Sequence, residues 1–156
     1  MSDPSVFAAG EAAYITGVSQ DTQRDWRRRG FLPPSVGKHT RFTVRELCHL
    51  RLIRAVLEAG FSLTLAASEI SVEFTDSLQA EVNACANPEY SSGMLAIIAR
   101  RDTSYFRQVV WSYQEIEDAV GCTGTEYETV HVIRLSKIAE DLVARGILDH
   151  PGLKDR

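Results

Sequence analysis

Apolar spacing and capping residues in the first part of the chain predict a series of short helices. Apolar side chains recur every three or four positions, as they do on one face of a helix. Some segments contain few apolar residues. For these, a serine just before the segment and a glycine just after it indicate where a helix begins and ends. The predicted helices cover residues 6–14, 20–29 and 44–59, with a fourth that begins at Ser62.

The second part of the chain mixes helix and strand patterns. Residues 74–86 fit one more helix, and residues 136–145 fit another that ends at Gly146. Between them lie apolar, β-branched and aromatic runs that predict strands over residues 94–99, 105–111 and 130–135, the first two forming a hairpin. We expect an α+β protein: a helical N-terminal domain over residues 1–71 and a small α+β domain over residues 72–156.

Charge is distributed unevenly between these two parts. The 156 residues carry a net charge of −4. Residues 1–62 hold nine basic and six acidic residues, a balance of +3, whereas the remaining 94 residues hold eight basic and fifteen acidic residues, a balance of −7. This asymmetry favours an anion-binding N-terminal module joined to a part that does not bind anions, although charges also cluster by chance.

The first two predicted helices have the layout of a helix-turn-helix. They are joined by Gly17-Val18-Ser19, and such a turn between two helices, the second of them basic, is typical of this motif. Arg24, Arg27 and Arg28 follow the i, i+3, i+4 spacing of one helical face. Polar side chains near the start of the second helix can meet base edges in a major groove. Trp26 is predicted to be the core anchor of this helix.

The residues of this stretch resemble the winged helix-turn-helix of the MerR family and its excisionase-like relatives. The resemblance covers residues 6–70 and includes an Arg-aromatic-Thr step at 41–43 and the Gly-Phe-Ser element at 60–62. The matching positions in and after the second helix are Thr22, Arg24, Trp26, Gly30, Phe31, Leu32 and Pro33.

The resemblance implies a set of DNA-contacting residues and a recognition helix over about residues 20–29. The residues expected at the major groove or its flanking phosphates are Thr22, Gln23, Arg24, Arg27 and Arg28. Those expected in the wing, against the DNA backbone or minor groove, are Lys38, His39, Thr40 and Arg41.

Other chemistry finds little support in the sequence. The stretch Gly37-Lys38-His39-Thr40 lacks the glycine spacing and the Lys-Ser/Thr step of a phosphate-binding loop. The three cysteines are scattered, and Cys48 and His49 are adjacent on a predicted helix, where their side chains diverge, so we expect no metal and no other cofactor. No spacing that would pair a nucleophile with a catalytic base is visible. Acidic pairs such as Glu115 and Glu117, which could share a strand face, are commonplace, so we expect that the protein is not an enzyme. No secretory signal or membrane span is visible.

These observations predict a cytoplasmic, bacterial or phage transcription regulator whose partner is double-stranded DNA. An excisionase-like architectural protein is one alternative, and an adaptor or ligand sensor that uses the helix-turn-helix to bind protein is another. We also expect a homodimer held by residues beyond 72, with room for an effector or protein partner there. The apolar residues that could supply the interface are Met94 to Ala99, Val109 to Trp111, Val130 to Ile133, Leu142, Val143 and Ile147, unless they form the domain's own core.

Overall fold

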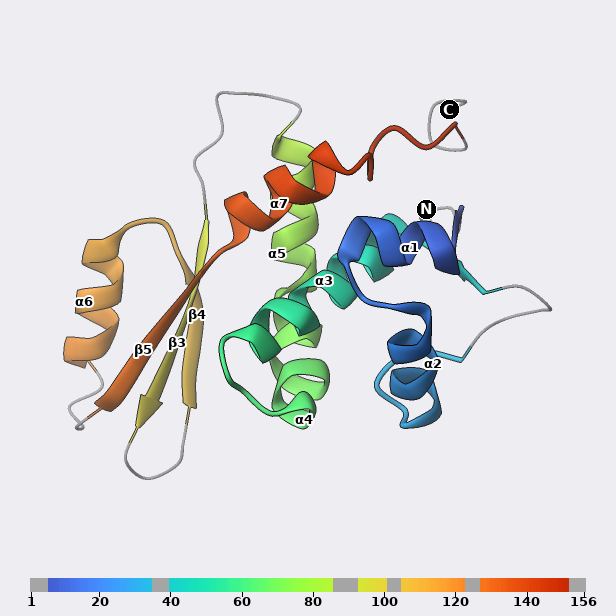
Figure 1. Cartoon of the computed structure of the whole chain (residues 1–156). Helices are drawn as coiled ribbons and strands as arrows, with labels where there is room; N and C mark the ends of the chain where they lie inside the picture. Colours follow the sequence, from blue (N-terminus) through green and yellow to red (C-terminus); the bar gives the residue numbers. More distant parts are fainter. Residues whose placement is uncertain (1–5, 35–39, 86–92, 101–104, 123–126, 152–156) are drawn as a thin grey trace.

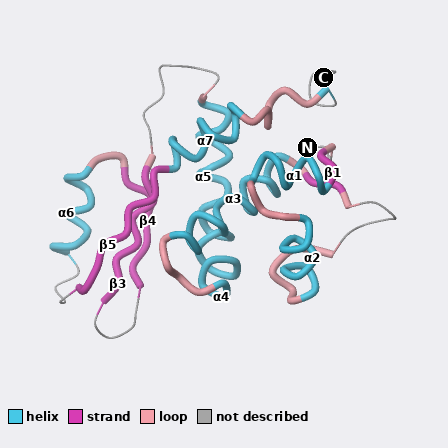
Figure 2. The backbone as a smooth tube through the Cα atoms, in the orientation of Figure 1, coloured by secondary structure: helices cyan, strands magenta, loops and turns pink. Residues whose placement is uncertain are grey.

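The computed structural model describes residues 6–34, 40–85, 93–100, 105–122 and 127–151, and it has a helical N-terminal part followed by a sheet flanked by helices (Figure 1). The tube in Figure 2 separates the helices from the two small sheets. The helices are α1 (Ala9–Thr16), α2 (Gln20–Arg28), α3 (Val44–Glu58), α4 (Leu63–Leu65), the π-helical turn η1 (Ala66–Ile70), α5 (Ser71–Ala84), α6 (Tyr113–Cys122) and α7 (Leu135–Ala144). The strands are β1 (Phe7–Ala8), β2 (Arg41–Phe42), β3 (Met94–Arg100), β4 (Tyr105–Val110) and β5 (Tyr127–Arg134). The predicted α+β class is confirmed.

The short strand β1 precedes the first helix, where the sequence pattern predicted helix from residue 6. β1 pairs antiparallel with β2, so that Phe7 lies opposite Phe42 and Ala8 opposite Arg41. Phe7 and Phe42 are both buried, and this burial outweighs the local helical spacing of the first residues. The prediction of an extended piece at Arg41 is confirmed.

The turn between α1 and α2 depends on a glycine. Gly17 ends α1 with a φ of +70°, a conformation that side chains other than glycine rarely adopt. A Cβ at Gly17 would also lie 1.6 Å from Nη1 of Arg54, so the guanidinium group occupies the space that a side chain would fill. The Ser19 hydroxyl then caps α2 by accepting from the Thr22 N–H.

The helix predicted from Ser62 and the helix predicted over 74–86 are one continuous helical run. α4, η1 and α5 follow each other without a break, and η1 is a π-helical turn within this run. The hydroxyl of Ser71 donates to the Ala67 carbonyl, and that of Thr75 donates to the Ser71 carbonyl, which satisfies both groups inside the helix. No proline or glycine interrupts the run, and packing of α5 between α3 and α7 extends it.

The three-stranded sheet has the order β4-β3-β5, with both outer strands antiparallel to β3, which confirms the predicted hairpin. Alternate residues of β3 face opposite layers: Leu95 and Ile97 join the core shared with the helices, whereas Met94 and Ala96 pack with Ile116 of α6. Because the sheet is covered on both faces, β3 is apolar from Met94 to Ala99. α6 lies on the far side of the sheet from α5 (Figure 1).

The sequence pattern predicted no helix at α6, and it placed Glu115 and Glu117 on a strand face. That placement is wrong, because both residues belong to α6. The helix has a visible start: Ser112 Oγ accepts from the Glu115 N–H, and the Glu115 carboxylate accepts from the Trp111 N–H. The spacing of Ile116 and the residues that follow then gives α6 one buried face.

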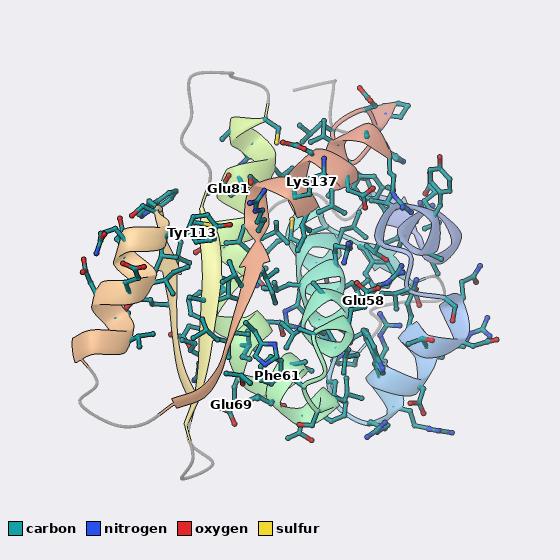
Figure 3. All side chains as sticks on the ribbon, turned by 60° about the vertical axis from the view of Figure 1, so that its left-hand side comes forward. Glu58, Phe61, Glu69, Glu81, Tyr113 and Lys137 are labelled. Carbon is teal, nitrogen blue, oxygen red and sulfur yellow. The ribbon has the colours of Figure 1, made fainter. Side chains whose placement is uncertain are left out.

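One hydrophobic core runs from the first strand to the segment after α7, on both sides of residue 71. Phe61, labelled in Figure 3, joins the two parts, since its ring meets the His131 ring of β5 edge-on with centroids 4.7 Å apart. Several of the residues expected at a dimer interface are buried inside this chain. The assignment of Leu95, Ile97 and Leu142 to an interface is therefore wrong, because each is fully buried within the chain's own core.

Candidate nucleic-acid interface

α2 is a polar helix with one narrow buried face. Gln23 and Trp26 are its buried residues, and Trp26 is 6% exposed, which confirms its prediction as the core anchor. The remaining positions face solvent or the edge of the domain, because nothing apolar on them requires cover. Among them, Arg24 and Arg28 have side chains that are 72% and 80% exposed.

A groove of about 360 Å³ lies between α2, the start of α1 and β2. Its basic lining comes from three arginines of two elements, Arg24 and Arg27 of α2 and Arg41 of β2. Thr40 and Gln20 add polar side chains. The groove therefore combines positive charge with hydrogen-bond donors, which suits phosphate oxygens.

Two of the three arginines in the groove bind backbone carbonyls of the segments next to β1 and α2. The Arg27 Nε donates to the Pro33 carbonyl at 2.8 Å, and its guanidinium carbon lies 5.3 Å from the centroid of the Phe42 ring. The Arg41 Nη1 donates to the Val6 carbonyl at 2.9 Å. These contacts hold the two guanidinium groups in place before any ligand arrives.

In the described part of the chain, the exposed side chains of Arg24 and Arg28 pair with acids of their own helix. Arg24 lies 2.8 Å from Asp21, and Arg28 lies 2.5 Å from Asp25. Exposed pairs of this kind contribute little to stability, and a phosphate can replace the carboxylate at small cost. Both arginines are thus available to an anionic partner.

The structure brings some of the predicted residues together and removes one from the surface. Gln23 was expected at the major groove, but it is 1% exposed. Its Nε2 donates to the carbonyls of Ala9 and Val18, so this amide fixes α1 against α2, and the expectation that its side chain is exposed is wrong. Its Oε1 is buried with no hydrogen-bond partner in the described part of the chain.

The other predicted positions divide into three groups. Thr22 is half-buried, and its hydroxyl lies 2.8 Å from the capping Ser19 hydroxyl. Thr40 and Arg41 lie in the groove described above. Lys38 and His39 lie outside the described residues.

The residues at the start of α1 were absent from the sequence-based site. Ala8, Ala9 and Gly10 line the groove because the β1–β2 pairing brings residue 8 next to residue 41. A side chain at Gly10 would contact Gln20, with its Cβ 3.5 Å from the amide nitrogen. No local pattern identifies these residues, since their partners are distant in sequence.

Among the described residues, no group of three or more His, Cys, Asp or Glu side chains is placed so that it could hold a metal ion. Cys48 is buried, and the adjacent His49 points its Nδ1 at the Thr75 hydroxyl, 3.1 Å away. Over the same described ranges, no helix combines the length and the apolar character needed to cross a membrane.

Comparison with known proteins identifies a family for the first part of the chain. Residues 7–69 match the family described as MerR HTH family regulatory protein. No curated protein matches the chain. The matched segment runs from β1 through η1 and contains the whole arginine-lined groove, so the predicted resemblance of this part of the chain to the MerR-type helix-turn-helix is confirmed.

Proposed function

We propose that the chain is a sequence-specific DNA-binding regulator of transcription that inserts α2 into the major groove. The observation that carries this proposal is the groove lined by Arg24, Arg27 and Arg41, which joins the exposed face of α2 to the base of the wing. Recognition helices of this class read bases near their N-terminus, and the flanking cations set the register on the phosphates.

Each arginine has a role that its position supports. Arg24 lies on the exposed side of α2, where its planar guanidinium group can meet a guanine edge or a phosphate. Arg27 and Arg41 are held by backbone carbonyls and suit a phosphate seated in the groove. Thr40 and the wing that precedes it would contact the DNA backbone or minor groove.

A homodimer that engages two half-sites remains part of the proposal. Single modules of this size rarely reach tight specific binding, and two-fold symmetric dimers gain affinity from repeated half-sites. The interface must lie outside the buried core residues, for example near the exposed side chain of Trp111. Sedimentation with and without bound DNA measures the stoichiometry.

The test begins with selection of preferred duplexes from a random pool by the full chain. Affinity for a selected duplex is then measured against salt concentration, because each phosphate neutralised contributes about 0.9 to the slope of log K against log salt. The paired substitution Arg24→Gln and Arg41→Gln should weaken binding by about ten-fold or more and reduce the slope. An unchanged affinity would contradict the groove assignment.

A matched control removes two cations elsewhere. Arg134 and Lys137 are exposed and lie on β5 and α7, away from α2. Arg134→Gln with Lys137→Gln should leave both affinity and salt slope close to those of the unmodified chain. An adaptor would show little DNA affinity at any salt concentration, whereas an architectural protein would occupy attachment-like sites rather than promoters in genome-wide immunoprecipitation.

A further inference from the structure

The segment that follows α7 returns to the N-terminal helix and contacts both of its ends. We call residues 145–150 the C-terminal strap. It begins directly after α7 and includes Ile147, which is fully buried in the common core. Gly146 has a φ of +87° and turns the chain, and the Ile147 N–H donates to the Leu142 carbonyl.

The first contact lies at the C-terminal end of α1. The Arg145 Nη1 donates to the Tyr14 carbonyl at 3.1 Å, and the same guanidinium group is oriented by Asp141 of α7. The last carbonyls of a helix lack partners within the helix and attract cations. Arg145 therefore supplies α1 with a C-terminal cap from a residue that is distant in sequence.

The second contact lies at the N-terminal end of α1. The His150 ring meets the Phe7 ring edge-on with centroids 4.8 Å apart, and its Nε2 lies 3.4 Å from Oε1 of Glu11. Glu11 is the residue that closes the N-terminus of α1, because its other carboxylate oxygen accepts from the Ala8 N–H at 2.6 Å. The strap thus spans α1 from its last turn to its first.

α1 in turn forms one wall of the arginine-lined groove. Its first residues line the groove directly, and Ala9 accepts a hydrogen bond from Gln23 of α2. Phe7 belongs to β1, which pairs with the strand that carries Arg41. A shift of α1 would therefore alter the distance between α2 and the base of the wing.

We propose that the C-terminal strap is a positioning element for DNA binding: through α1 and β1 it holds the two sides of the groove in register. This inference rests on the proposed function. Through these contacts the C-terminal part of the chain is coupled to the DNA-binding surface. A movement of α7 or of the sheet would displace Arg145 and His150, and with them α1 and α2.

The test uses the full chain with Arg145→Gln and His150→Ala combined. Amide hydrogen exchange in α1 should become about ten-fold faster while exchange in α5 and β3 stays unchanged, because local opening needs only the lost contacts. Affinity for the selected duplex should fall about five-fold. The salt slope should not change, since no phosphate contact is removed. Arg145→Lys alone keeps a cation and a donor and should retain near-normal exchange.

The control is Arg134→Gln with Lys137→Gln, which removes two charges from the same part of the chain without touching α1. Unchanged exchange in α1 of the strap variant would overturn the proposal. Faster exchange with unchanged DNA affinity would overturn the positioning role. If the unmodified chain selects no duplex, the proposed function fails, whereas the contact of the strap with α1 is still decided by the exchange measurement.

Discussion

Arg24 and Arg28 of α2 differ from several arginines elsewhere in the chain in where their partners lie. Arg24 and Arg28 pair with Asp21 and Asp25, each three residues away on the same helix. Within the described residues, these pairs join the outer face of α2 to no other element.

Several arginines elsewhere join elements that are distant in sequence. Arg45 of α3 lies 2.7 Å from Asp76 of α5, and Arg107 of β4 lies 2.6 Å from Glu73 of α5. Arg145 donates to a carbonyl of α1. Net charge alone therefore does not identify a binding surface. In α3, β4 and the segment after α7, arginines link elements that are distant in sequence, whereas on the exposed face of α2 they remain accessible to a ligand.

The largest expected effect tests the buried face of α2. Trp26→Ala should lower the free energy of unfolding by about 3–5 kcal/mol, the usual cost of deleting a large buried aromatic side chain. Arg24→Ala on the exposed face should change it by less than about 0.5 kcal/mol. Urea denaturation of both variants measures the difference. Equal stabilities would show that α2 is not anchored through Trp26.

The sequence predicts the arginine face of α2 and its anchor Trp26 because the information for both is local. The arginine face follows from helical spacing, and the cap at Ser19 and the stop at Gly30 lie next to the helix. The match of residues 7–69 to a known family confirms the family resemblance that these residues indicated.

Features that depend on distant partners could not be predicted in this way. The burial of Gln23 is set by a carbonyl of α1, fourteen residues away, and β1 forms only because β2 lies beside it. The apolar residues of β3 fit a dimer interface as well as a core, and only the placement of α5 and α6 on opposite faces decides between these. α6 had a local signal in Ser112 and Glu115, which the strand interpretation of the region obscured.

A smaller effect concerns pH and the interior of α3. Burial is the main cause that lowers the pKa of His49 below 6.5, and the positive charge of Arg45 lowers it further, against opposing backbone hydrogen bonds. The unfolded chain therefore takes up this proton at a higher pH than the folded chain. Stability should decline as the pH falls through 6.5 and stop declining below the folded pKa, with a slope of at most about 1.4 kcal/mol per pH unit. Urea unfolding between pH 7.5 and 5.5 measures this, and His49→Gln should flatten the curve relative to the unmodified chain.

The smallest effect tests the comparison of the arginines directly, through two double-mutant cycles on stability. The pair Arg107–Glu73 joins β4 to α5, and its guanidinium side chain is 27% exposed, so we expect a coupling energy of about 1 kcal/mol. The pair Arg24–Asp21 lies on one helix with both side chains largely exposed, so we expect about 0.3 kcal/mol. High salt should reduce the second coupling more than the first, because solvent-exposed charges are screened most strongly. Equal couplings would mean that the Arg24–Asp21 pair stabilises the fold as much as the Arg107–Glu73 pair does. Arg24 would then be less available to DNA than its exposure indicates.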